Sequence, residues 1–351
     1  MTDKTLGHPR LKHQKQDRSK DSITSTATAF ILAGATATGK TAVAQILAEQ
    51  MGCSILSADA MLVYKGMDIG TAKPTVADRG DIPYAGIDLV TPAEPFSTGR
   101  WIESAVAVLK DFVPHHQAAA GTPPAAKHNP SSLIVVGGTG LYIKALTDGI
   151  QSAVAHPEVR EKWQLVFDHS GISGLQSALR QRAPEAFASL SDTSNPRRLL
   201  RALEQLETCG TLPDQWKNND ASTAPVIVLS LPREQLHRRI ARRVDQMFQT
   251  GFVEEVRALR KAYPVWSSTA AKAIGYEEVS ALLDNTLTQE VAREKMIIRT
   301  RQLAKRQETW FRHQSKAHWL TLTEDDTPQA IAERVDELWR HHGPTTVQIP
   351  G

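Results

Sequence analysis

The stretch GATATGKT, residues 34–41, follows the apolar run FILA and decides the fold. Its spacing, a glycine, four residues and then Gly-Lys-Thr, is typical of a loop that holds phosphate between a strand and a helix. Glycine is needed where the backbone turns through positive φ, so that consecutive amides point at an anion. Lys40 can supply charge to a terminal phosphate, and the Thr41 hydroxyl can coordinate Mg²⁺. An accidental glycine turn is the alternative, but the flanking strand and helix patterns favour phosphate binding.

Three further apolar segments extend this unit into a sheet. They read SILS at residues 54–57, LIVV at 133–136 and VIVL at 226–229, and helical patterns lie between them. Strands that alternate with helices form a parallel sheet with both faces covered. We therefore predict an α/β fold with helices on both faces of a parallel sheet.

The domain boundaries follow from where the strand pattern stops and resumes. Residues 1–28 are polar without an apolar period, which predicts a disordered tail. Residues 151–220 have helical patterns and no strand signal, which predicts a helical insertion. The other expected parts are a core at 29–150 and 221–335, a variable surface loop at 113–132 and a second tail at 336–351.

Composition excludes several classes of protein. Of the 351 residues, 41% are hydrophobic and 23% are charged, as in a soluble globular chain. Cys53 and Cys209 are far apart and have no metal-ligand spacing, so neither a disulfide framework nor a zinc site is expected. The chain shows no run of about 18 apolar residues and no signal-peptide core, so we expect a cytoplasmic protein without a membrane span. The net charge of +3 is weak support for a nucleic-acid partner.

A hydrolytic nucleotide site also needs an apolar strand that ends in aspartate, which holds magnesium. The best candidate strand, at residues 133–136, ends in Gly137-Gly138 instead. Asp88 is a substitute, although its context, YAGIDLVTP, is less apolar. The absence of a convincing acidic strand end weakens the kinase and ATPase interpretations.

Asp59 follows the predicted strand at residues 54–57. The carboxyl ends of parallel strands face the ligand crevice, so Asp59 is expected beside the phosphate loop. A carboxylate there can act as a general base, bind magnesium or cap a helix. The residues alone leave these three roles open.

The segment after Asp59, YKGMDIGTAKP at residues 64–74, closely resembles a signature of the tRNA dimethylallyltransferases, also called tRNA isopentenyltransferases. The resemblance continues in the same order to about residue 320. Its other segments are GGTGLY from Gly137, NPRRLLRALE from Asn195, GFVEEVRAL from Gly251, IGY from Ile274 and TRQLAKRQETWFR from Thr300. The resemblance implies a P-loop NTPase-like core with a helical insertion, as read above.

The family moves a dimethylallyl group from dimethylallyl diphosphate to the exocyclic N6 amine of the adenosine beside the anticodon, position 37 of tRNA. The resemblance therefore implies that the loop holds a diphosphate leaving group with Mg²⁺ on Thr41. It implies Asp59 as the base that accepts the amine proton. The other implied catalytic residues are Lys40, Thr139 and Arg243. The implied diphosphate loop is Gly34, Ala35, Thr36, Ala37, Thr38, Gly39, Lys40 and Thr41.

Two positions depart from the family pattern. Ala60 stands where members commonly have serine, beside the target nucleotide, so one hydrogen bond to the substrate is missing. Arg100-Trp101 stands where the family often has an acidic residue and phenylalanine. The first departure concerns substrate positioning rather than the reaction.

The segment LHRRIARRVDQMF offers further cations. Its apolar residues share one helical face at about 100° per residue. Arg243 lies close to that face and Arg239 at its margin, whereas Arg238 and Arg242 point away. An arginine beside a buried face needs an anionic partner. We expect Arg243, which also matches a family arginine, to bind the diphosphate with Arg239 second; a structural ion pair is the alternative.

The predicted helix at residues 294–312 has an apolar face, and Arg301, Lys305 and Arg312 project from the other side. A solvated face is the ordinary reading of such cations, but family resemblance favours contact with the tRNA anticodon stem-loop. Arg197, Arg198 and Arg201 in the insertion invite the same two interpretations. The implied tRNA contacts are Asp59, Ala60, Met61, Leu62, Thr139, Arg160, Arg197, Arg198, Arg201, Lys272, Gly275, Tyr276, Arg301, Lys305, Arg306, Gln307 and Arg312.

Three other functions remain to be weighed. An adenylate isopentenyltransferase uses the same chemistry on a free nucleotide, but has little use for the insertion and the second basic helix. A small-molecule P-loop kinase would transfer the γ-phosphate of ATP. A non-catalytic RNA-binding protein would not need Lys40, Thr41, Asp59 and Arg243 together. One site per chain makes a monomer sufficient, and we expect a monomer.

Overall fold

The computed structural model describes residues 23–110, 133–148, 156–190, 192–212 and 224–350. Its centre is a sheet in the order β3-β2-β4-β1-β5-β6, in which every neighbouring pair is parallel. The strand β7 adds to β1 in antiparallel register. The strands are β1 (Ile23–Gly34), β2 (Ser54–Ser57), β3 (Tyr84–Ala85), β4 (Leu133–Gly137), β5 (Ile227–Ser230), β6 (His318–Thr321) and β7 (Thr345–Pro350).

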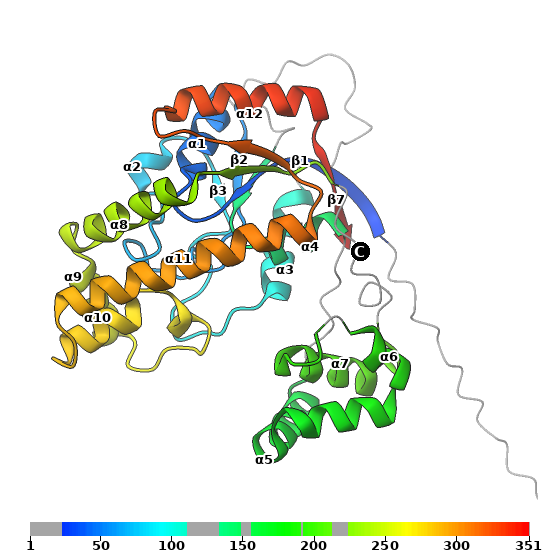
Figure 1. Ribbon diagram of the computed structural model, residues 1–351. Coiled ribbons are helices and arrows are strands. Elements are labelled where there is room, and N and C mark those ends of the chain that lie inside the picture. The colour runs from blue at the N-terminus through cyan, green and yellow to red at the C-terminus, as the bar shows by residue number, and fades with distance from the viewer. Residues whose placement is uncertain (1–22, 111–132, 149–155, 191, 213–223, 351) are drawn as a thin grey trace, which may run out of the picture.

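Helices cover both faces of this sheet, as predicted. Figure 1 shows α1 and α12 on one face, and α3, α4 and α11 on the other. The central strands β4 and β5 are buried along their whole length, which explains their unbroken apolar sequences. The core helices are α1 (Lys40–Met51), α2 (Val76–Arg79), α3 (Thr98–Lys110), α4 (Gly140–Asp148), α8 (Arg233–Gln249), α9 (Phe252–Ala262), η2 (Ala270–Lys272), α10 (Tyr276–Leu283), α11 (Gln289–Gln314) and α12 (Pro328–His342).

The predicted tails are wrong where the structure describes them. β1 begins at Ile23 rather than near residue 29, and its first half pairs with β7. The expected tail at 336–351 instead holds the end of α12 and all of β7 up to residue 350. Trp339 of α12 is buried, with its ring centroid 5.0 Å from that of Phe30. The small residues of β1 and the polar TTVQ of β7 carry too little apolar signal to reveal this pairing. Residues 1–22 and the variable loop at 113–132 lie outside the described residues.

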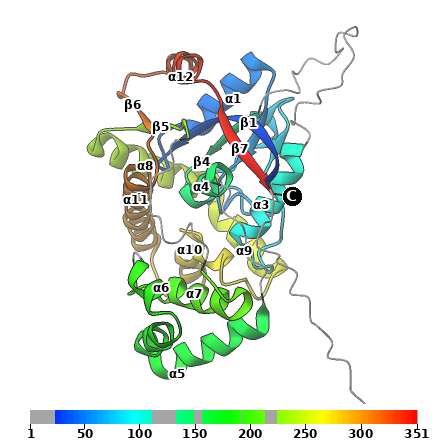
Figure 2. The ribbon, with the colours of Figure 1, turned by 90° about the vertical axis from the view of Figure 1, so that its right-hand side faces the viewer.

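The described part of the predicted insertion is helical and has its own core. It consists of α5 (Pro157–Arg182), α6 (Pro184–Ser189) and α7 (Pro196–Cys209). Trp163, Leu175 and Leu179 of α5 pack with Leu199 and Leu203 of α7 in a cluster separate from the main core. Figure 2 shows these three helices together, away from the sheet. Among the described residues, no helix combines the length and apolarity that a membrane crossing requires.

Candidate active site

The phosphate loop lies between β1 and α1 and turns through left-handed backbone at Ala37 (φ 66°) and Gly39 (φ 91°). Ala35 and Thr38 are fully buried, and the Thr38 hydroxyl donates to the Ala35 carbonyl at 2.9 Å. These two residues therefore stabilise the loop from inside the protein. The Thr36 amide is already engaged, because it donates to Gln307 Oε1 at 2.8 Å.

Three cations surround the loop. Lys40 begins α1, and its Nζ donates to the Ala35 carbonyl at 3.3 Å. Arg243 of α8 donates to the Thr71 carbonyl at 3.1 Å, in the segment that resembles the family signature. Arg239 also reaches the loop, because its Nη1 would lie 3.9 Å from a Cβ added at Gly39. Arg239 thus lies beside the phosphate loop, and Arg243 lines a cavity together with Lys40 and Thr41. Binding of a diphosphate by either arginine stays a prediction.

Electrostatics couple Lys40, Asp59 and Arg243. Burial lowers the pKa of Lys40 to about 8, with Asp59 opposing this shift and Arg243 adding to it. Burial likewise lowers the pKa of Arg243, and Asp59 again opposes the shift. Burial disfavours the charged forms of Lys40 and Arg243, and a phosphate anion bound between them would stabilise those charged forms.

Asp59 lies just beyond the carboxyl end of β2 and is held by its neighbours. Its Oδ1 accepts from the Met61 amide at 2.9 Å, while the Ala60 amide donates to Thr139 Oγ1 at 3.0 Å. The Thr139 amide in turn donates to the Ala58 carbonyl at 3.1 Å. Within the described ranges, Asp59 Oδ2 has no hydrogen-bonding partner. This leaves one carboxylate oxygen for a substrate proton.

Two cavities meet at Asp59. The smaller, about 40 Å³, lies at Lys40, Thr41 and Ser57 and is also lined by Leu62. The larger, about 320 Å³, is lined by Met61 and by cations from other elements, among them Lys272, Arg299 and Arg306. Four residues line both: Thr36, Asp59, Thr71 and Arg243. One chamber thus suits a phosphate group and the other a second, larger substrate, with a carboxylate and an arginine at the junction.

The smaller cavity also fits magnesium. Thr41, Ser57 and Asp59, whose side chains carry oxygen atoms, line it together. Within the described residues there is no cluster of three or more histidine, cysteine or acidic side chains suited to a metal. A metal here would depend on phosphate and water for its other ligands, which is the mode that Mg²⁺ favours.

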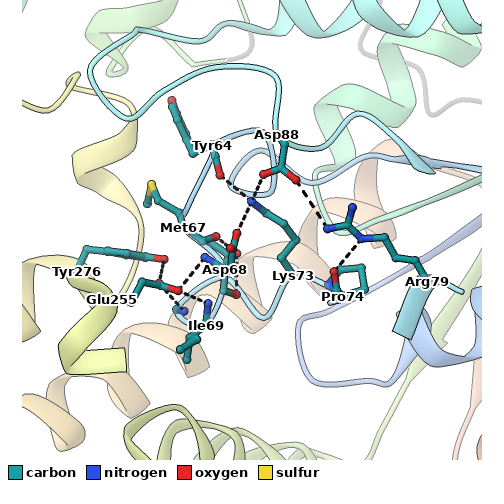
Figure 3. A network of polar contacts seen from close by, with 12 residues as sticks. Tyr64, Met67, Asp68, Ile69, Lys73, Pro74, Arg79, Asp88, Glu255 and Tyr276 are labelled. Atoms are coloured by element: carbon teal, nitrogen blue, oxygen red, sulfur yellow. Dashed lines mark hydrogen bonds and ion pairs between the residues drawn. The ribbon is translucent and has the colours of Figure 1, made fainter. Parts of the chain in front are cut away.

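The signature-like segment after Asp59 is fixed by a buried lysine, which Figure 3 shows. The side chain of Lys73 is 1% exposed and forms ion pairs with Asp68 at 2.7 Å and Asp88 at 2.5 Å. Arg79 adds a longer pair to Asp88, at 3.7 Å. Asp88 is therefore engaged in these ion pairs, which argues against it as the magnesium-binding aspartate that an ATPase has at the end of a strand.

The departure at Trp101 has a structural role. Trp101 is fully buried, its Nε1 donates to the Ser57 carbonyl at 2.9 Å, and it stacks on Tyr142 with a centroid distance of 4.4 Å. The indole thereby holds the end of β2 from which Asp59 follows. Ala60 holds Thr139 through its backbone amide, which serine or any other residue except proline would also supply.

The helix α11 docks directly on the phosphate loop. Gln307 accepts from Thr36 and donates from Nε2 to the Gly138 carbonyl at 3.1 Å. Gly140 faces Trp310, with no room for a Cβ, which would lie 2.1 Å from the indole. Gln307 was expected to contact RNA, but its amide group is occupied by the protein on both sides.

The cations of α11 divide into paired and unpaired groups. Arg293 pairs with Asp245, and Arg299 pairs with Glu277 at 3.0 Å and with Glu278. Across the described ranges, no ion pair involves the later cations, Arg301, Lys305, Arg306 and Arg312.

These unpaired cations face two different spaces. Arg306 lines the larger cavity beside Asp59. Arg301, Lys305 and Arg312 line a separate cleft of about 790 Å³ with Arg233 of α8. Arg301, Lys305 and Arg312 thus share one face of α11, as predicted, and Arg306 lines the larger cavity.

Two predicted RNA contacts are structural. Tyr276 is 1% exposed, and its hydroxyl donates to Glu255 Oε1 at 2.7 Å. Gly275 is buried at φ 101°, where an added Cβ would lie 2.8 Å from both Met296 and Phe252. Both residues are buried in the protein without RNA, so the RNA contacts expected at these two positions stay predictions that no exposed atom here supports.

The remaining predicted RNA contacts lie on exposed elements. The pKa of Lys272 is lowered, mainly by partial burial and also by the positive charge of Arg197. Arg197 belongs to the insertion, so its charge is felt by a lysine that lines the larger cavity. Arg198 is exposed. Arg160 and Arg201 instead form ion pairs with the buried Glu204, at 3.6 and 3.1 Å. Arg160 and Arg201 are thus engaged within the insertion, and their contact with RNA stays a prediction.

The IPP transferase family model matches residues 62–314 of the chain, and an isopentenyl transferase model matches residues 27–80. A tRNA dimethylallyltransferase of Pelotomaculum thermopropionicum is 36% identical over 310 residues, 87% of this chain and 94% of that protein. The tRNA dimethylallyltransferase of Kineococcus radiotolerans is 35% identical over 316 residues, 87% of this chain and 94% of that protein.

A solved structure agrees with these matches. The tRNA isopentenylpyrophosphate transferase of Bacillus halodurans is 29% identical, with a TM-score of 0.59, covering 89% of this chain and 97% of its own. A eukaryotic dimethylallyltransferase solved acting on tRNA shares the fold at a TM-score of 0.69 and 22% identity, covering 90% of this chain and 80% of its own. The chain belongs to the IPP transferase family and is a relative of tRNA dimethylallyltransferases.

Proposed function

We propose that this protein transfers a dimethylallyl group from dimethylallyl diphosphate to the N6 amine of the adenosine beside the anticodon, position 37 of tRNA. The observation that carries the proposal is the junction of two cavities at Asp59 and Arg243. The smaller cavity has the residues for a diphosphate, and the larger has room and charge for a nucleotide. The protein acts as a monomer in the cytoplasm, with one complete site in the chain.

Leaving-group stabilisation is the task of the smaller cavity. As the bond between the allyl carbon and oxygen breaks, negative charge develops on the diphosphate. Lys40, Arg243 and Arg239 surround the position where that charge appears. Mg²⁺ held by Thr41 and Ser57 would supply further positive charge to the phosphate oxygens when bound, which leaves the Asp59 carboxylate for the amine proton.

Nucleophile activation is the task of Asp59. An adenine amine is a weak nucleophile, because its lone pair is delocalised into the ring. As the new bond between nitrogen and the allyl carbon forms, Asp59 Oδ2 accepts the amine proton. Met61 and Thr139 keep the carboxylate at the cavity junction through their backbone and hydroxyl contacts. The products are N6-dimethylallyladenosine in the RNA and free diphosphate.

RNA binding involves the outer cations. To reach a base of the anticodon loop, the enzyme extrudes the adenosine into the larger cavity. Arg306 and Lys272 line that cavity, and Arg301, Lys305 and Arg312, which form no ion pair within the described residues, line the neighbouring cleft. Arg197 and Arg198 of the insertion supply further contacts to phosphates.

We expect substitution of Lys305 by glutamine to weaken RNA binding and to reduce the slope of log affinity against log salt by about 1, because one phosphate contact is lost. Arg238→Gln is the matched control, since Arg238 is 53% exposed but pairs with Glu324 at 2.7 Å. Fluorescence anisotropy with a labelled anticodon stem-loop at several salt concentrations measures both slopes. Equal slopes for the two variants would contradict an RNA role for this cleft.

The function is tested by incubating the protein with unmodified tRNA and dimethylallyl diphosphate labelled in the allyl group. We expect label in the RNA, recovered as N6-dimethylallyladenosine, and none in a tRNA with guanosine at position 37. The proposal fails if the protein binds the tRNA but transfers no label. A parallel incubation with γ-labelled ATP tests the kinase alternative, which the ion pairs of Asp88 already disfavour.

A free adenine nucleotide is the remaining alternative substrate. The same incubation with labelled dimethylallyl diphosphate and AMP in place of tRNA tests it. We expect no product there. AMP is too small to reach the cations of the insertion and of the cleft beside α11, so it would lack the contacts that hold a tRNA.

A further inference from the structure

Glu255, in the first turn of α9, is bound by four hydrogen-bond donors. Its Oε2 accepts from the backbone amides of Asp68 at 3.0 Å and Ile69 at 2.6 Å. Its Oε1 accepts from the Gly70 amide at 3.2 Å and from the Tyr276 hydroxyl at 2.7 Å. Figure 3 shows this carboxylate beneath the turn that leads to Lys73. One side chain therefore fixes three consecutive peptide groups.

The fixed turn leads directly to the diphosphate arginine. Thr71 follows Gly70, and its carbonyl accepts from Arg243 Nη2 at 3.1 Å. Thr71 and Arg243 line both cavities at their junction. A shift of the turn would move the carbonyl and with it the guanidinium, which has no acidic partner within 4 Å in the described residues.

The turn has little freedom to shift on its packed side. A Cβ added at Gly70 would lie 2.3 Å from the Phe252 ring and 2.7 Å from Tyr276. Phe252 belongs to the same first turn of α9 as Glu255, so this helix contacts the segment both by packing and through the carboxylate. If the contact with the Glu255 carboxylate is lost, the turn can therefore move only away from α9, toward the cavities.

We propose that Glu255 is a positioning residue for diphosphate binding: by holding the amides of residues 68–70, it sets the Thr71 carbonyl that orients Arg243. This inference rests on the proposed function, because it assumes that Arg243 binds the diphosphate. Glutamine cannot fully replace Glu255, since in either orientation its NH₂ group faces at least one backbone amide, which can only donate.

Glu255→Gln tests the proposal, with inorganic diphosphate and Mg²⁺ as the ligand in isothermal titration. We expect a dissociation constant roughly 10-fold to 100-fold higher than that of the wild type, as for misplacement of a binding group. Glu254→Gln is the matched control, one residue away and exposed; within the described residues its one ion pair is with Arg257, at 3.4 Å. It should bind diphosphate like the wild type.

A double-mutant cycle separates positioning from general loosening. In an Arg243→Gln background, Glu255→Gln should weaken diphosphate binding no further, because its effect passes through the arginine. An additive effect, or wild-type affinity of Glu255→Gln, would overturn the proposal. If Glu255→Gln does not fold, Glu255→Asp is put through the same cycle with the same required outcome.

The outcomes also separate this proposal from the proposed function. If the wild type binds diphosphate and the cycle is non-additive, but no allyl group reaches tRNA, the transferase function fails and the positioning role stands. If transfer occurs and the cycle is additive, the positioning role alone fails.

Discussion

Asp59→Asn is expected to lower the rate of dimethylallyl transfer by about 10²-fold to 10⁴-fold, the range for loss of a general base. Asparagine keeps an oxygen that can accept from the Met61 amide, so the turn after β2 should persist. What is lost is the oxygen that has no partner in the described residues and can take the amine proton.

The measurement is a single-turnover reaction with saturating protein, which reports the chemical step rather than binding. RNA affinity is measured alongside, and should stay within about threefold of the wild type because a neutral amide replaces only one of many contacts. Transfer by Asp59→Asn at near the wild-type rate would remove Asp59 as the base. Asp59→Ala then shows how much of any loss comes from the disturbed turn.

The parts of the fold that could be predicted are those with a strong local pattern. The strands β2, β4 and β5 are buried apolar runs, and each was placed to within a residue or so. β3 has only two residues, and β7 is polar along much of its length, so neither shows a strand pattern. Their positions depend on partners distant in sequence, which a local pattern does not contain.

The site divides in the same way. Lys40 is expected from the loop motif, whereas Asp59 and Arg243 are expected from the strand edge and the helical periodicity only together with the family resemblance. Glu255 could not be found from the residues around it, because its partner amide at Asp68 lies 187 residues away. Tyr276 shows the limit of a family motif: it was expected as an RNA contact, and in the protein without RNA it is buried and donates to Glu255.

Lys40→Met should weaken binding of dimethylallyl diphosphate by about 10²-fold to 10³-fold, since a buried charged partner of the leaving group is removed. Methionine preserves most of the side-chain volume, and loses only the 3.3 Å hydrogen bond to the Ala35 carbonyl within the loop. The loop should therefore stay folded while its charge is lost.

The pH dependence of binding provides a sharper version of this experiment. Burial lowers the pKa of Lys40 to about 8 in the free protein, so the lysine is charged at pH 7 and mostly neutral at pH 9. Because binding requires the charged form, wild-type affinity should fall by about tenfold between these values. Titration of the diphosphate itself affects the wild type and Lys40→Met equally, so the ratio of their affinities isolates the lysine. A ratio that does not change with pH would show that Lys40 does not bind the diphosphate through its charge, and would shift that role to Arg243 and Arg239.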